Sequence, residues 1–112
     1  MDIKSSAFSR LGPDFKGTTI LGNGIDQEVL RRAGIERADA FVAATQGDNR
    51  NIMASQIAKH VFGVTRVVTR IYDPLRSDTF AALGLQAISP TIIGANSFYE
   101  QLTGESAPSL PV

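Results

Sequence analysis

Short apolar runs alternate with helical patterns along most of the chain. The apolar runs predict strands at residues 18–21, 40–44, 64–71 and 86–89, because they are rich in β-branched residues or continuous over strand length. Between and after these runs, apolar residues recur at helical spacing. This repeated order of strand and helix predicts an α/β fold with a parallel sheet, helices on both faces and right-handed crossovers.

Capping residues mark the expected ends of the helices. Asp26 and Ser89 stand where an N-cap side chain accepts a hydrogen bond from the first turn. Asp73 is followed by a proline, which suits the first helical position. Gly34 and Gly84 are each followed by a hydrophobic residue, the pattern of a helix that ends in a left-handed glycine.

Four loops are expected to share one edge of the sheet, at residues 22–26, 45–49, 70–73 and 89–91. They follow the carboxyl ends of the predicted strands, and ligands of parallel α/β sheets bind beyond that edge. Arg70 ends a buried strand there, which favours a contact with a phosphate or a carboxylate. An ion pair with Asp73 or Asp48 is the alternative.

The charge and composition exclude several classes of function. Eleven Lys and Arg balance eleven Asp and Glu, and the resulting net charge of zero argues against nucleic acid as the main partner. The chain has no Cys and a single histidine, His60, so neither thiolate catalysis nor a metal site is expected. No segment has the ~20 apolar residues of a membrane span, and the edge loops hold no pair of base and nucleophile. We therefore expect a cytoplasmic protein that is not an enzyme.

The loops and their neighbouring elements, taken in order, resemble a known family. The segments are LGPDFKG (residues 11–17), GNGID (22–26), LRRAGI (30–35), ADAFVAATQGDNRNIMAS (38–55), TRIYDP (69–74), LG (83–84) and ISPT (88–91). In this order they resemble the TrkA-N nucleotide-binding domain, which is the RCK-type regulatory domain of potassium uptake systems and potassium channels. The resemblance defines a partial domain over residues 1–102, with residues 103–112 as a flexible tail.

The resemblance implies a regulatory function in potassium transport. Members of this family have a Rossmann fold, bind NAD(H) or ATP/ADP, and assemble as dimers or rings beneath a membrane pore subunit. The implied partners are a membrane potassium-transporter subunit and either further copies of the chain, as a homo-oligomer, or a complementing chain. The implied location is the inner face of the membrane, reached through the partner without direct insertion into the bilayer.

Two other functions remain as alternatives. In the first alternative, the chain is a fragment of a nicotinamide-dependent oxidoreductase. In the second, it is an assembly module that dimerises through the helix at residues 90–102. The apolar face of that helix carries Phe98, Tyr99 and Leu102. We expect this face to cover the chain's own sheet rather than a second copy.

The chain departs from the family at its N-terminus. Family members begin with a strand, a GxGxxG loop, a helix and a second strand that ends in an acidic residue, and here the match starts at that acidic position, Asp2. The glycines of such a loop let backbone N–H groups approach the pyrophosphate, so nucleotide binding is expected to be weakened or lost. The favoured interpretation is that this sequence begins after the first strand, the glycine-rich loop and the first helix of the family's domain. A second polypeptide that supplies the missing half, or an exchange of elements between two copies, are the alternatives. Within this chain, the strands at residues 18–21 and 40–44 are expected to lack their common neighbour.

The candidate nucleotide site consists of Asp2, Asn23, Gly24, Thr45, Gln46, Gly47, Asn49 and Arg70. By the resemblance, Asp2 binds the adenosine ribose, and Asn23 and Gly24 lie near the adenine edge. The resemblance also implies that the loop from Thr45 to Asn49 lies against the central ribose and the phosphates of the nucleotide. Structural roles are the alternatives: Asp2 as a disordered terminal residue, Asn23 as a turn residue and Asp48 as a helix cap.

Overall fold

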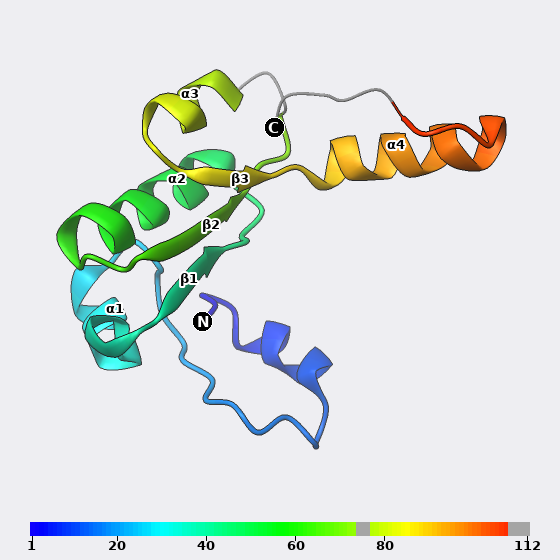
Figure 1. Ribbon diagram of the computed structural model, residues 1–112. Helices are drawn as coiled ribbons and strands as arrows, with labels where there is room; N and C mark the ends of the chain where they lie inside the picture. Colours follow the sequence, from blue (N-terminus) through cyan, green and yellow to red (C-terminus); the bar gives the residue numbers. More distant parts are fainter. Residues whose placement is uncertain (74–76, 108–112) are drawn as a thin grey trace.

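The sheet is parallel and three-stranded in the computed structural model, which describes residues 1–73 and 77–107 (Figure 1). The strands β1 (Ala40–Ala43), β2 (Arg66–Arg70) and β3 (Gln86–Ile88) lie in the order β1-β2-β3. In the register, Phe41 is aligned with Val67, and Thr69 with Ala87. The predicted α/β fold with a parallel sheet is therefore confirmed.

Helices alternate with these strands along the chain. They are α1 (Gln27–Ala33), α2 (Asp48–Gln56), α3 (Ser77–Ala82) and α4 (Pro90–Thr103). α2 continues into a turn of π-helix, η3 (Ile57–Val61), and two short 3-10 segments are η1 (Ser5–Leu11) and η2 (Ile35–Arg37). α2 packs on β1 and β2, and α3 packs on β3, so each of the three strands contacts a helix.

Local capping interactions place the helix ends where the sequence predicts them. The Asp26 carboxylate accepts a hydrogen bond from the N–H of Glu28 at 2.9 Å, and Ser89 Oγ accepts one from the N–H of Ile92 at 3.3 Å. Gly34 follows α1 with φ 96°, in the left-handed region that favours glycine. The predicted proline at the start of the third helix, Pro74, lies outside the described residues.

One apolar cluster holds the helices to the sheet. Its buried members are Leu30, Ile35, Ala58, Val64, Val67, Ile71, Phe80 and Leu85. Leu30 from α1 and Phe80 from α3 are each 1% exposed, and full burial of such a side chain contributes roughly 1.5–3 kcal/mol. Since Val67 and Ile71 belong to β2 and the residue after it, the cluster fixes the central strand, whose carboxyl end carries Arg70.

Residues 18–21 do not form the predicted strand. Leu21 makes an isolated parallel bridge to Asp2, where the N–H of Gly22 donates to the Asp2 carbonyl at 2.9 Å. β1 pairs with β2 along one edge, and within the described part of the chain no strand occupies its other edge. A strand obtains its hydrogen bonds from a neighbour, so residues 18–21 stay irregular despite their β-branched composition.

α4 projects away from the sheet (Figure 1). None of its residues is buried, and Phe98 and Leu102 are 73% and 85% exposed. The prediction that the apolar face of this helix covers the chain's own sheet is therefore wrong. The contact with the body of the protein lies at the first turn, where Ser89 is buried and Thr91 Oγ1 donates to the Tyr72 carbonyl at 3.3 Å. Such a contact anchors the start of the helix without bringing its later turns back to the sheet.

The overall dimensions agree with this open arrangement. The radius of gyration is 16.0 Å, whereas a compact domain of this length has about 13 Å. Figure 1 shows that α4 and the N-terminal segment with η1 account for the extension, because both stand apart from the sheet. In the part of the chain that the structure describes, no helix is long and apolar enough to cross a bilayer. The division into a domain at residues 1–102 and a tail stays a prediction, since residues 108–112 lie outside the described residues.

Candidate functional site

The loop between β1 and α2 is held by a buried asparagine. Asn51 is 0% exposed, and its Oδ1 accepts hydrogen bonds from the N–H of Thr45 at 2.9 Å and from Thr45 Oγ1 at 2.6 Å. Its Nδ2 donates to the carbonyl of Thr45 at 3.0 Å and to that of Arg70 at 2.9 Å. These four bonds use the full capacity of the amide. Asn51 therefore ties the end of β1 to the end of β2.

Asn51 is not among the site residues predicted from the sequence. A signal was present, because Asn51 lies three, four and seven residues before Ala54, Ser55 and Ala58, all of which are buried on the inner face of the helix. A polar side chain on the inner face of a helix must find hydrogen-bond partners in the core or at its boundary. The pattern thus indicated a structural asparagine without identifying its partners.

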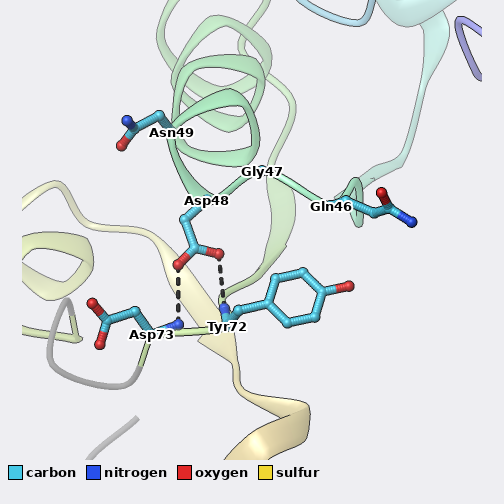
Figure 2. Close-up of a pocket in the computed structure, with 6 residues that line it drawn as sticks. All are labelled: Gln46, Gly47, Asp48, Asn49, Tyr72 and Asp73. Carbon is cyan, nitrogen blue, oxygen red and sulfur yellow. Dashed lines mark hydrogen bonds between the residues drawn. The ribbon is translucent and has the colours of Figure 1, made fainter.

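Asp48, the first residue of α2, connects the same loop to the loop after β2 (Figure 2). Its two carboxylate oxygens accept hydrogen bonds from the N–H of Tyr72 at 2.8 Å and from the N–H of Asp73 at 3.0 Å. The alternative role as a helix cap is wrong, because the N-cap of α2 is Gly47 and no side chain caps it. The Asp48 carboxylate therefore bridges the loops after β1 and β2 and does not cap its own helix.

Arg70 crosses the carboxyl end of the sheet toward β1. Its Nη2 donates to the carbonyl of Ala44 and, at 3.1 Å, to that of Thr45. Its guanidinium lies 4.9 Å from the ring centroid of Tyr72, within the range of a cation–π contact. The Nε atom is buried and has no hydrogen-bond partner among the described residues. Arg70 forms no ion pair with Asp48, whose carboxylate serves the neighbouring loop, and the pairing with Asp73 stays a prediction.

Five of the candidate site residues line one groove of about 830 Å³ between the N-terminal segment and β1: Asp2, Gly24, Thr45, Gln46 and Arg70. A smaller pocket of about 330 Å³ lies beside it (Figure 2), and its lining consists of Gln46, Gly47, Asp48, Asn49, Tyr72 and Asp73. Gln46 belongs to both, so the loop after β1 separates the two hollows. The structure thus brings most of the candidate residues to one edge of the sheet, on both sides of this loop.

Asn23 lines neither of these two hollows. Its Oδ1 accepts a hydrogen bond from the N–H of Ile25 at 3.1 Å, as in an Asx turn, whereas its backbone is not in the left-handed conformation. Asp2 forms a bridge to Leu21, its Oδ1 accepts a hydrogen bond from the N–H of Lys4 at 2.9 Å, and it lines the groove. His60 is exposed and lies in η3, away from the groove, and the described residues contain no group of side chains able to hold a metal ion.

Comparison with known proteins identifies the family. The profile of the TrkA-N domain matches residues 1–90. The chain belongs to the TrkA-N domain family. The resemblance drawn from the sequence is thereby confirmed.

Two relatives in this family are potassium uptake proteins. The Trk system potassium uptake protein TrkA of Streptomyces coelicolor is 40% identical over 110 residues, which is 98% of this chain and 49% of that protein. A TrkA homologue of Pyrococcus abyssi is 36% identical over 92 residues, covering 77% of this chain and 40% of the homologue. The chain therefore spans about half the length of these relatives, or less.

Solved structures confirm the Rossmann-like fold. The RCK domain of GsuK superposes with a TM-score of 0.72 at 26% identity, over 83% of this TrkA-N chain and 21% of the GsuK chain. The NAD(P)-binding domain of an exopolyphosphatase-related protein from Archaeoglobus fulgidus has a TM-score of 0.70 at 14% identity, over 93% of this chain and 77% of that one. The second likeness concerns the fold alone.

Proposed function

We propose that this TrkA-N chain is a regulatory nucleotide-binding module of a potassium ion transport system. Its relatives are Trk system potassium uptake proteins, and the structural neighbour at 26% identity is the RCK domain of the GsuK channel. Because the chain spans less than half of those relatives, a membrane transporter subunit as partner and a place at the inner face of the membrane belong to the same proposal.

The observation that carries the proposal is the convergence of the candidate residues on one groove. Asp2 comes from the N-terminal segment, Gly24 from the loop before α1, Thr45 from the end of β1 and Arg70 from the end of β2. They meet at the carboxyl edge of a parallel sheet, where ligands of this fold class bind. A volume of about 830 Å³ lies in the range of sites for ligands of the size of NAD(H) or ATP/ADP.

A regulatory rather than an enzymatic role is favoured by the lining of the groove. Its ionisable side chains are arginine, lysine and aspartate, and no histidine or cysteine lies along it in the described residues. Cationic side chains bind anions well, but they do not supply the pair of acid and base that most transfer reactions require. We therefore propose that the module senses a nucleotide without transforming it.

Titration with NADH and with ATP tests the function. The chain is compared with a version extended at its N-terminus by a β-α-β unit that carries a GxGxxG loop, and with the same extension in which the loop glycines are replaced by alanine. The extended chain is expected to bind more tightly than the other two, because its glycines bring N–H groups close to the pyrophosphate. Equal and tight binding by all three would contradict the role given to the loop, and no binding by the extended chain would contradict the function.

The exposed face of α4 supports assembly as part of this function. Phe98 and Leu102 are more than 70% exposed on a helix that projects from the body, and large apolar side chains gathered in this way are typical of contact surfaces. We propose that copies of the chain associate through α4. Sedimentation velocity over a range of concentrations tests this, and a monomer at every concentration would exclude it.

A further inference from the structure

The loop before α1 contains an asparagine that is followed directly by a glycine. Asn23 and Gly24 are both partly exposed, and they lie in a turn in which the N–H of Asp26 donates to the Asn23 carbonyl at 3.0 Å. The nitrogen of the next residue can attack an asparagine side-chain amide, and glycine permits this most readily because it has no Cβ and the widest backbone freedom. The pair therefore places an electrophile and a nucleophile at consecutive positions of an accessible loop.

The atoms that would react are not held by other partners. In the described part of the chain, neither the Gly24 N–H nor the Asn23 Nδ2 forms a hydrogen bond. The attacking nitrogen does not belong to a helix or a sheet, so the reaction requires no local unfolding. Gly24 is also sterically open, since a Cβ built on it would have no heavy atom within 4 Å apart from its chain neighbours.

One hydrogen bond orients the side chain for this attack. Asn23 Oδ1 accepts from the N–H of Ile25 at 3.1 Å, and the ring that this bond closes contains the Gly24 nitrogen. The amide is thus folded back over the peptide that follows it. The N–H of Ile25 also faces the oxygen on which negative charge develops when Cγ is attacked, and a donor at such a position stabilises the transition state.

We propose that Asn23 is a site of spontaneous deamidation through a succinimide formed with Gly24. In the first step, the Gly24 nitrogen bonds to Asn23 Cγ, the bond from Cγ to Nδ2 breaks, and Nδ2 leaves as ammonia together with the proton of the Gly24 N–H. In the second step, water opens the ring at one of its two carbonyls. Opening at Cγ gives aspartate, and opening at the main-chain carbonyl gives isoaspartate. Neither step involves an oxidant or a reductant.

The two products have different consequences for α1. Aspartate keeps the main chain unchanged and adds a negative charge close to the N-terminus of the helix, which the helix dipole tolerates. Isoaspartate extends the main chain by one carbon and converts the former Asn23 carbonyl into a free carboxylate, so the turn that leads to Asp26 is lost. Because Asp26 caps α1 and Leu30 of that helix belongs to the core, the isoaspartyl form is expected to be the less stable one.

Mass spectrometry of tryptic peptides follows the reaction at every asparagine. Asn23, Asn49, Asn51 and Asn96 fall in four different peptides between the lysine and arginine residues. The purified chain is incubated in mildly alkaline buffer with and without urea, and isoaspartate is counted by an isoaspartyl-specific carboxyl methyltransferase. Asn23 is expected to convert fastest, at a rate that rises with pH. Asn96 also precedes a small residue, Ser97, but is expected to stay intact in the folded chain because the N–H groups of α4 donate along the helix.

Two glycine substitutions form a matched pair. Gly24→Ala is expected to slow the conversion of Asn23 severalfold or more, because the added methyl group obstructs the attack. The turn is retained in this variant, since Gly24 has no positive φ and has space for a Cβ. Gly94→Ala makes the same change at an equally open position of α4 and is expected to leave the rate at Asn23 unchanged. Circular dichroism verifies that both variants are folded.

The comparison with urea separates the folded geometry from the sequence alone. Conversion of Asn23 in the folded chain at least as fast as in urea supports the proposal. Clearly slower conversion in the folded chain means that the turn protects the amide, and the proposal is then wrong. If Gly24→Ala and Gly94→Ala both convert at the rate of the unchanged chain, the succinimide route is wrong. None of these outcomes depends on nucleotide binding, so the proposed function is tested separately.

Discussion

Replacing Asn51 tests how the candidate site is held together. In Asn51→Ala, the N–H of Thr45 loses the acceptor Oδ1 and the carbonyl of Arg70 loses the donor Nδ2 of a side chain that is 0% exposed. A buried polar group without a partner costs about 1–3 kcal/mol, so two such groups give about 2–6 kcal/mol. Thr45 itself is exposed, and water can replace part of its bonding, which places the expected loss in the lower half of this range, about 2–3 kcal/mol. That is a large share of the 5–15 kcal/mol of a typical domain.

A second substitution separates hydrogen bonding from volume. Asn51→Asp keeps the size of the side chain and the oxygen that accepts from Thr45, but it places an oxygen where Nδ2 donates to the carbonyls of Thr45 and Arg70. Repulsion between these oxygens makes the loss in Asn51→Asp at least as large as that in Asn51→Ala. If packing volume were the main contribution, Asn51→Asp would instead be close to the unchanged chain.

Urea unfolding followed by circular dichroism measures both effects as changes in the free energy of unfolding. Gln46→Ala is the control, because Gln46 lies in the same loop with an exposed side chain, and its loss is expected to stay within about 0.5 kcal/mol. A loss below about 1 kcal/mol in Asn51→Ala, or an Asn51→Asp variant as stable as the unchanged chain, would refute the view that this amide fixes the site.

Three further substitutions address other contacts. Asp48→Asn leaves a single acceptor oxygen for two N–H groups and is expected to lose about 1 kcal/mol in urea unfolding, with exposed Asp39→Asn as an unaffected control; equal stability of the two would contradict the bridging role. Thr69→Val removes the buried hydroxyl that donates to Ser55 Oγ at 2.6 Å and is expected to lower the free energy of unfolding by about 1–2 kcal/mol. In the double variant Thr69→Val/Ser55→Ala, the loss is expected to be smaller than the sum of the two single losses; additive losses would show that the two hydroxyls are not coupled. Phe98→Ser is expected to leave the free energy of unfolding within about 0.5 kcal/mol while lowering self-association in sedimentation, and a strongly destabilised variant would show that α4 packs on the body.

The parts of the fold that depend on local chemistry could be predicted from the sequence. Asp26, Ser89 and Gly34 act within one turn of their own positions, so residue type alone identifies the helix ends. The apolar runs of β1 and β2 predict strands from residue type and run length, even though β1 is only partly covered and Val42 is 65% exposed. Residues 18–21 have the same kind of pattern, but among the described residues they have only the isolated bridge of Leu21 to Asp2, and pairing with another strand is a long-range property that composition does not contain.

The candidate site likewise has a part that the sequence predicts and a part that depends on long-range contacts. Topology places the loops after β1 and β2 at one edge, so the meeting of Thr45 and Arg70 in one groove could be predicted. The partners of Asn51 and Asp48 could not, because each side chain reaches a main-chain group about 20 residues or more along the chain, whose position is known only in the folded protein. The prediction for α4 was wrong, because an apolar helix face is suited to its own sheet and also to a second chain, and the pattern of the helix does not distinguish the two.

The contacts of Tyr72 connect the groove to the projecting helix. Its N–H donates to Asp48 at the start of α2, its ring lies against the guanidinium of Arg70, and its carbonyl accepts from Thr91 in the first turn of α4. Tyr72 therefore joins Arg70, which lines the groove, to the hydrogen bond that anchors the first turn of α4. Because no residue of α4 is buried, the direction of the helix depends on the few contacts at its first turn. The contacts of Tyr72 thus connect the sheet edge that carries the candidate residues to the helix proposed as an assembly surface.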